Sequence, residues 1–224
     1  MDERGYERVA AATGVVAVVA FLIGFLAPGV PPLGSDPASK VQSFFVDKRT
    51  AILIGTLLVW VGTIFLLWFV GALRTHLRRH ENDGGRLSAL AFGGGVALMA
   101  TILLGSFITA GLAYNVARTA SPQIVKAFYD VGSVALLLTG PPSVVLLGAA
   151  SLAILRRGAL PVWLAWFGLA AAVIDLAAIA PVFSTSGIAS PTGPAGFIAF
   201  GVSMLWLVAT SVALYMRIGA PAGA

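Results

Sequence analysis

The sequence predicts an all-α, polytopic membrane protein built as a bundle of six transmembrane helices. Of its 224 residues, 58% are hydrophobic and 10% are charged, whereas soluble domains average about 45–50% and about 25%. A single core cannot bury that excess, because a soluble fold needs polar residues to cover its surface. Apolar runs recur along the chain, and several reach the roughly 18 residues needed to cross a hydrocarbon layer of about 30 Å as a helix.

Six spans account for these runs and make residues 1–224 a single membrane domain. The first span follows the charged leader MDERGYER. No small-residue cleavage site follows its apolar run, so we expect a retained helix and not a cleaved signal peptide. The spans are expected at residues 9–28, 50–73, 87–114, 124–155, 161–183 and 195–216.

The basic residues predict the orientation of these spans, because lysine and arginine accumulate in cytoplasmic connections. Nine of the fourteen lie at the two termini and in the second and fourth connections: Arg4, Arg8, Arg74, Arg78, Arg79, Arg86, Arg156, Arg157 and Arg217. The opposite side carries five: Lys40, Lys48, Arg49, Arg118 and Lys126. We therefore expect both termini in the cytoplasm and a multi-pass protein of the bacterial inner (plasma) membrane. The net charge of +5 then reflects topology, and the expected partner is the lipid bilayer, not nucleic acid.

The first external connection is the longest, and its segment GSDPASKVQSFFVDKR (34–49) predicts a short helix. Asp36 before Pro37 is a favourable N-cap and first-turn pair. Apolar residues then recur on one helical face: Ala38, Val41, Phe44 and Phe45. Such a helix either lies on the membrane surface or packs over the mouth of the bundle.

Small residues at helical spacing predict where spans pack closely. In the third span they recur every fourth position, at Gly93, Ala97, Thr101, Gly105, Thr109 and Ala113. In the second span they form a stripe of Gly55, Thr56, Gly62 and Thr63. Small residues let helix backbones approach where hydrophobicity cannot drive association. In the fourth span, Pro141 and Pro142 within TGPPSVV (139–145) remove backbone donors and predict a kink.

One acid, Asp175, lies in the otherwise apolar run AAVIDLAAIA (171–180). At mid-membrane an acid costs roughly 2.5–3.5 kcal/mol on insertion scales. Small residues share its helical face: Gly168, Ala171, Ala172 and Ala178. Asp175 is therefore expected to face a neighbouring helix about 12 Å from the outer end of its span. Two interpretations remain open: a site that binds a proton or ion, and a structural clamp that hydrogen-bonds serines, threonines or an arginine across helices.

Other polar residues are expected at the same depth, in the outer half of the membrane. Asp130 lies a similar distance inside the fourth span and can pair with Lys126 one turn earlier. We predict an outward-facing polar pocket formed by Asp175, Asp130, Asn115, Tyr114, Arg118, Ser203 and Arg49.

Several chemistries find no support in the sequence. There is no cysteine, and both histidines, His76 and His80, lie in the basic segment 74–86. Their spacing could place two metal ligands on one helical face together with Glu81 and Asp83, but neighbouring arginines would repel a cation; a solvated loop at the lipid headgroups is the alternative. No nucleophile motif, Walker loop or dinucleotide fingerprint occurs. We therefore expect no catalytic residue, no metal and no cofactor.

The segment GALPVWLAWFG (158–168) resembles a family of uncharacterised bacterial six-helix membrane proteins, in which a basic turn leads into a G-x-L-P-x-W-L helix start. The resemblance implies the six-helix fold and no particular activity.

Three functions are consistent with these observations. The leading hypothesis is the binding or movement of a small solute or proton through the outward-facing pocket. The second is an accessory or scaffold protein that packs with another membrane protein or with copies of itself. The third is an intramembrane enzyme that uses Asp130 and Asp175 as acid and base, for which the sequence supplies no nucleophile.

Overall fold

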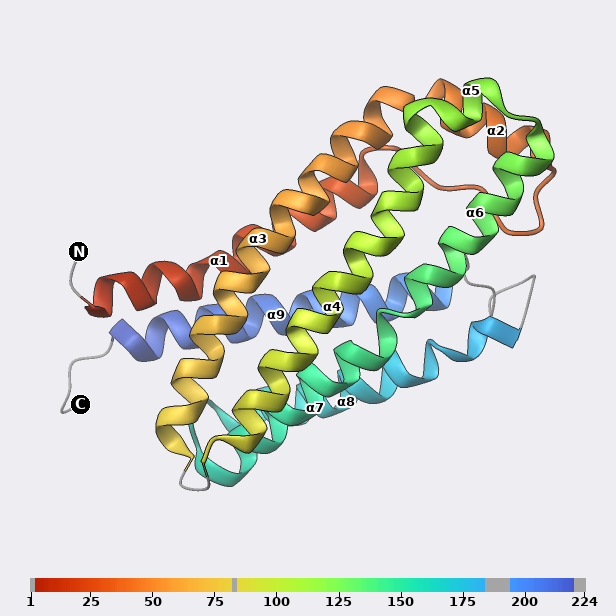
Figure 1. The fold of residues 1–224 in the computed structure, drawn as a ribbon. Helices are drawn as coiled ribbons and strands as arrows, with labels where there is room; N and C mark the ends of the chain where they lie inside the picture. The colour runs from red at the N-terminus through yellow and green to blue at the C-terminus, as the bar shows by residue number, and fades with distance from the viewer. Residues whose placement is uncertain (1–2, 82–83, 184–193, 220–224) are drawn as a thin grey trace.

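A computed structural model of the protein describes residues 3–81, 84–183 and 194–219. These residues form helices and no strand, which confirms the all-α class (Figure 1). The long helices are α1 (Glu3–Leu26), α3 (Arg49–His80), α4 (Arg86–Gly111), α6 (Pro122–Leu137), α7 (Gly140–Arg157), α8 (Val162–Ala177) and α9 (Pro194–Gly219). The short elements are α2 (Ala38–Asp47), the π-helix η1 (Leu112–Val116), α5 (Ala117–Thr119) and the 3₁₀-helix η2 (Ala180–Phe183).

Five helical segments in the described residues are long and apolar enough to cross a membrane. They are Gly5–Leu26, Arg49–His80, Arg86–Thr119, Pro122–Arg157 and Gly196–Ile218. The predicted span at 161–183 is shorter than expected, because α8 ends at Ala177. Its 16 residues rise about 24 Å.

The predicted break in the fourth span is present where α6 gives way to α7. Leu138 and Thr139 separate the two helices, and the proline pair occupies the first turn of α7. Proline cannot donate the hydrogen bond that the carbonyl four residues earlier would accept. The carbonyls of Leu137 and Leu138, four residues before Pro141 and Pro142, therefore lack their helical donors.

The glycine and threonine stripe of the second span is buried, as predicted, and packs against α1. A Cβ placed on Gly24 of α1 would lie 2.6 Å from the carbonyl oxygen of Gly55, and one placed on Gly55 would overlap the carbonyl of Gly24. Two helical turns further along α3, a Cβ on Gly62 would lie 2.8 Å from the ring of Phe21. Glycine is thus what allows the α1 and α3 backbones to touch.

The predicted ladder of the third span is wrong at its start. Gly93 and Ala97 are exposed, and nothing lies within 4 Å of a Cβ on Gly93. The close contact is made one residue later, where a Cβ on Gly94 would lie 2.6 Å from the backbone nitrogen of Leu146 in α7. Further along, Gly105 is buried beside Leu136 as the ladder predicts.

Helix α2 packs over one end of the bundle, which decides between its two predicted positions. Val41 and Phe45 are 0% and 3% exposed, and they pack with Tyr129 of α6. Gln42 donates to the carbonyl oxygens of Ala117 and Ala120 at 2.9 and 3.0 Å. The N-cap of α2 is Pro37 with no side-chain cap, so the prediction that Asp36 caps this helix is wrong.

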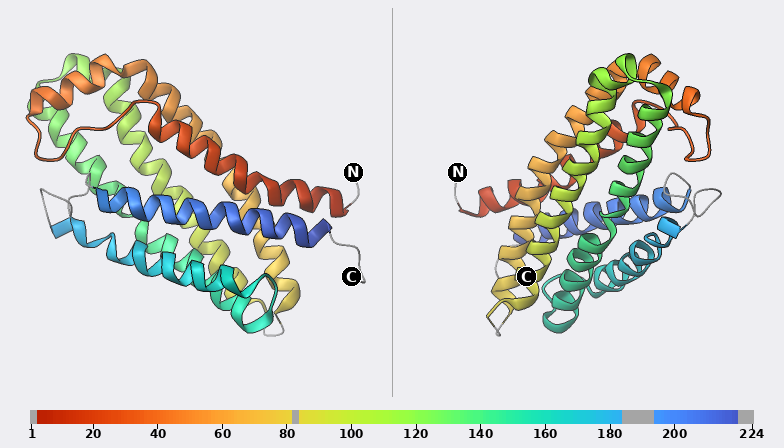
Figure 2. Two further views of the ribbon diagram at one scale, coloured as in Figure 1. Left: turned by 180° about the vertical axis from the view of Figure 1, so that it is seen from behind. Right: turned by 45° about the vertical axis from the view of Figure 1, so that its right-hand side comes forward.

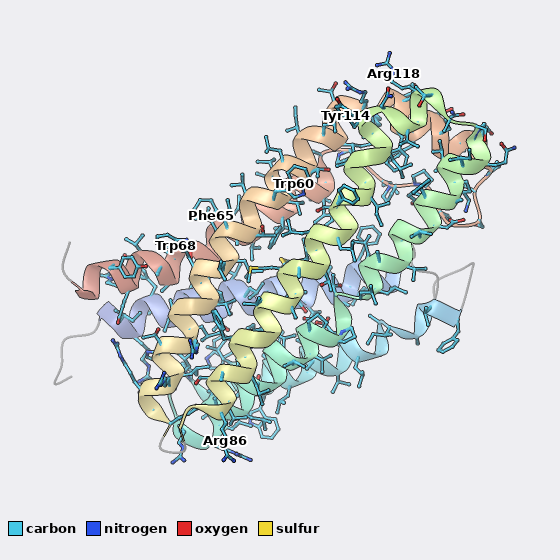
Figure 3. All side chains as sticks on the ribbon, in the orientation of Figure 1. Trp60, Phe65, Trp68, Arg86, Tyr114 and Arg118 are labelled. Atoms are coloured by element: carbon cyan, nitrogen blue, oxygen red, sulfur yellow. The ribbon has the colours of Figure 1, made fainter. Side chains whose placement is uncertain are left out.

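The described ends of α1 and α9 lie at the same end of the bundle as the α3–α4 and α7–α8 turns (Figures 1 and 2). The side chains of Arg86 and Arg118 mark opposite ends (Figure 3). The helices with an end on the Arg86 side of the bundle, α1, α3, α4, α7 and α9, carry the nine basic residues predicted for one side. This end is called the basic end below. The end with α2 and α5, which the basic residues predict to face outward, is called the outer rim.

Candidate functional site

Asp175 lies in a buried polar cluster formed by three helices. Its side chain on α8 is 6% exposed. Ser203 of α9 donates its hydroxyl to both carboxylate oxygens, at 3.0 and 2.9 Å. Ser143 of α7 donates a short hydrogen bond to Oδ2. Both serines are buried as well. The carboxylate is therefore held by one hydroxyl from each neighbouring helix.

The small residues of α8 explain how such short side chains meet. Two turns before Asp175, a Cβ on Gly168 would overlap the Ser151 hydroxyl of α7 and would lie 2.5 Å from Nε1 of Trp206 in α9. Helix α8 therefore touches α7 and α9 closely at Gly168. Trp206 strengthens this contact by donating to the carbonyl oxygen of Leu164 at 3.0 Å. Serine and aspartate side chains reach one another only because these backbones are close.

Asp175 lies at the end of a helix, and not about 12 Å inside the end of its span as predicted. Helix α8 ends two residues later, at Ala177. A carboxylate near a helix C-terminus meets the negative end of the helix dipole. At the same time, Ser143 lies in the second turn of α7, whose N-terminus has the opposite polarity. The acid thus lies between the end of one helix and the start of another.

The other predicted acid, Asp130, is placed quite differently. It lies on α6 with a side chain that is 49% exposed, and Lys126 donates to its two oxygens at 2.5 and 2.6 Å. The predicted pairing one helical turn apart is confirmed. No hydrogen bond or ion pair between described residues joins Asp130 to Asp175.

The remaining predicted residues lie at the outer rim. Tyr114, Asn115 and Arg118 are exposed, in the π-helix η1 and in α5 (Figure 3). Arg49, at the start of α3, donates long hydrogen bonds of 3.4 and 3.3 Å to the carbonyl oxygen of Tyr114. The hydrogen bonds thus assemble two separate groups, Asp175 with Ser203 and Arg49 with Tyr114. A pocket that unites all seven residues remains a prediction.

Sequence reasoning missed Ser143, which completes the Asp175 cluster. Its signal was the break itself, because Ser143 directly follows the two prolines that begin α7. Sequence reasoning did not predict the partner of Tyr129, whose hydroxyl donates to the carbonyl oxygen of Pro32. No periodicity connects a tyrosine in α6 with the segment before α2.

The segment with the two histidines is helical up to His80 and is not a loop. His76 bonds to the carbonyl oxygen of Ala159 at 2.9 Å, which ties the end of α3 to the α7–α8 turn. His80 bonds to the carbonyl of His76 at 2.9 Å. Asp83 lies outside the described residues. Within the described ranges, no group of three or more histidine or acidic side chains could hold a metal ion.

Comparisons with protein families, with curated proteins and with solved structures gave no significant match. The resemblance at residues 158–168 therefore remains a prediction.

Proposed function

We propose that this chain is a membrane protein that binds and moves a proton or a small cation at Asp175. The observation that carries the proposal is a buried carboxylate that is held by two hydroxyl groups beside a broken helix. Among the described residues, no lysine or arginine forms an ion pair with it.

A charged carboxylate in this position has no positive group among the described residues to balance it. Hydroxyl donors offset part of the desolvation of a buried charge, but they supply no counter-charge. A charged acid inside a membrane is unfavourable, by roughly 2.5–3.5 kcal/mol where it lies at the centre. Binding of a proton or cation removes that charge, so occupancy of the site alters the energetics of the α7–α8–α9 contact. Ser143 and Ser203 can remain bonded in either state, because a hydroxyl both donates and accepts.

The break between α6 and α7 adds oxygen ligands near the same place. The carbonyls of Leu137 and Leu138 lack helical donors. Gly140 lies against the end of α8, since a Cβ there would be 2.7 Å from Ile179 and 3.3 Å from the carbonyl oxygen of Asp175. In secondary transporters, interrupted helices and freed carbonyls near the bilayer midplane form ion and substrate sites. The same combination of acid and interruption supports ion binding here.

The proposal includes a topology of six spans with both termini in the cytoplasm of a bacterial inner membrane. Five helices are long and apolar enough to cross, and we assign α8 as a short sixth span that η2 extends. Support comes from the two described ends lying at the basic end (Figure 1). Positive residues favour the cytoplasmic side. Asp175 would then lie nearer the external surface.

The test uses protein reconstituted in liposomes that contain a pH-sensitive dye and are subjected to a pH or sodium gradient. Asp175→Asn keeps the shape and most hydrogen bonds but cannot ionise. We expect this variant to remain folded and to lose ion movement. Asp130→Asn is the matched control, because it removes an exposed acid that has its own lysine. Flux that persists in Asp175→Asn would contradict the proposal.

One observation favours a second function, that of an accessory subunit of another membrane protein. The Asp175 cluster joins three helices, which is what a structural clamp requires. In that case Asp175→Asn, which keeps most of these hydrogen bonds, melts like wild type, and the wild-type protein moves no ion on its own.

A further inference from the structure

The basic end carries a surface hollow of about 350 Å³ on the last two turns of α3. It is lined by Arg74, Thr75, Arg78 and Arg79. The hollow lies where α3 ends, and Arg86 begins the next helix, α4, at the same end of the bundle (Figure 3). None of the chemistry proposed for Asp175 uses these residues.

The charge around the hollow favours an anion. Arg79 is neutralised by Glu7 of α1, to which it donates at 2.9 and 2.5 Å. The described residues contain no ion-pair partner for Arg74 or Arg78. The carboxylate of Glu81 is engaged by the backbone nitrogen and hydroxyl of Ser88, both at 3.0 Å.

The geometry of Arg74 leaves its charge unbalanced. Its guanidinium lies over the ring of Phe92 in α4, 5.2 Å from the ring centre. A cation–π contact of this kind orients the guanidinium but does not cancel its charge. Arg74 and Arg78 lie one helical turn apart on α3, and their guanidinium groups offer the forked donors that match a phosphate group. The Thr75 hydroxyl donates to the Gly71 carbonyl oxygen at 3.1 Å, so the arginines supply the donors.

An apolar track on the same helix leads from the membrane interior to this hollow. Ile64, Leu67 and Trp68 are 58%, 44% and 47% exposed. Leu67, Gly71, Arg74 and Arg78 then follow one another at helical spacing on one face of α3. Nothing lies within 4 Å of a Cβ on Gly71, so the track has open space directly above the arginines.

An aromatic pair borders this track near the basic end. Tyr6 of α1 and Trp68 of α3 lie with ring centres 5.9 Å apart, and Trp68 projects from the α3 surface (Figure 3). Tyrosine and tryptophan concentrate at the level of lipid headgroups. The arrangement therefore presents an apolar wall, an aromatic boundary and an anion site in the order in which a phospholipid presents its chain, glycerol and phosphate.

We propose that this hollow is a binding site for an anionic phospholipid. Arg74 and Arg78 hold the phosphate, and one acyl chain lies along Leu67 and over Gly71. Basic pockets beside transmembrane helices bind acidic lipid headgroups through this chemistry. The site needs no ion movement at Asp175, and it depends on α3 crossing a membrane.

The binding test measures phosphatidylglycerol on the purified full-length protein by native mass spectrometry, with phosphatidylcholine as the reference lipid. We expect the double variant Arg74→Gln/Arg78→Gln to bind phosphatidylglycerol about tenfold more weakly or worse. The double variant Arg156→Gln/Arg157→Gln removes the same charge at the same end of the bundle and is expected to bind like wild type. Equal losses in the two variants would show a diffuse electrostatic attraction and would overturn a defined site.

A second pair of variants separates a lipid from a free anion with the same phosphate chemistry. Gly71→Trp fills the open space above the arginines and should weaken phosphatidylglycerol binding. Inorganic phosphate added to the wild-type protein should not displace the bound lipid. Gly148→Trp in α7 is the control, because nothing lies within 4 Å of a Cβ there either. Unchanged lipid binding in Gly71→Trp, or displacement of the lipid by inorganic phosphate, would assign the hollow to a soluble anion and overturn the lipid proposal.

Discussion

The Asp175 cluster and the outer rim both contain acidic side chains, but they satisfy them in opposite ways. Asp175 is buried and accepts from serines on two other helices. Asp36 at the rim and Asp130 on the exposed side of α6 each pair with a lysine one turn away, at 2.9 and 2.5 Å. Water can replace a lost partner at the rim and cannot do so between helices in the membrane. Interior contacts therefore depend on how closely backbones approach, and rim contacts depend mainly on solvent and pH.

The largest effect is expected where two backbones touch. Gly55→Ala places a methyl group against the Gly24 carbonyl, so α1 and α3 must separate along their interface. Overpacking of this kind typically costs about 1–3 kcal/mol. The measurement is the free energy of unfolding in mixed micelles.

Gly71→Ala is the control on the same helix. Nothing lies within 4 Å of a Cβ at Gly71, and alanine is a better helix former than glycine by about 1 kcal/mol. We expect this variant to be as stable as wild type or more stable. Equal destabilisation at both positions would mean that the close contact between α1 and α3 does not limit stability.

A smaller loss is expected when the Asp175 cluster loses one donor. Ser203→Ala removes the hydroxyl that bridges both carboxylate oxygens. Hydrogen bonds between membrane helices average about 0.6 kcal/mol and reach about 1.7 kcal/mol, and a bond to an acid belongs toward the upper value. Ser133→Ala is the control, because that buried hydroxyl donates within its own helix, to the Tyr129 carbonyl. Equal melting temperatures for the two variants would contradict the expectation that the interhelical bonds of Ser203 stabilise the fold more than the local bond of Ser133.

Composition and periodicity were enough to predict helices that the structure contains, because apolar length is a local property. The stripe at Gly55 and Gly62 and the break at Pro141 were likewise readable, since each depends on residues close in sequence. The ladder failed at Gly93 because a four-residue repeat does not specify which of two adjacent glycines, Gly93 or Gly94, meets a partner.

The Asp175 cluster was only half predictable for a related reason. Asp175 and Ser203 stand out as polar residues within apolar runs, but their meeting depends on three helices approaching at Gly168. Ser143 was hidden beside the prolines. The early end of α8 at Ala177 also had no local signal, because the apolar run continues past it.

A near-neutral outcome is expected at Gly105, where the contact involves a flexible side chain. A Cβ there would lie 3.1 Å from Cδ2 of Leu136. The end of this leucine side chain can move away by a few tenths of an ångström. For Gly105→Ala, the gain in helix propensity of up to about 1 kcal/mol offsets that adjustment. Destabilisation as large as that of Gly55→Ala, measured in the same micelles, would show that α4 and α6 pack as rigidly as α1 and α3.

The smallest effect is expected at the rim and should depend on pH. The hydrogen bond from Lys40, followed by that from the Leu33 backbone, lowers the pKa of Asp36 below its ordinary value of 3.8. A lowered pKa stabilises the folded state above 3.8, and this contribution disappears as the pH falls through the folded pKa.

Hydrogen exchange of the α2 amides is the measurement, because the contact holds the start of α2 and not the whole bundle. We expect Asp36→Asn to exchange faster than wild type at neutral pH. The two proteins should converge once the pH is well below 3.8, where the acid of the wild type is also uncharged. Asp175→Asn is the contrasting variant. The Asp175 carboxylate has no lysine partner among the described residues, and α8, which carries it, packs mainly against α7 and α9. We expect no change in the exchange of the α2 amides in this variant. A difference between Asp36→Asn and wild type that persists at acidic pH would mean that shape, and not charge, holds this segment at the rim.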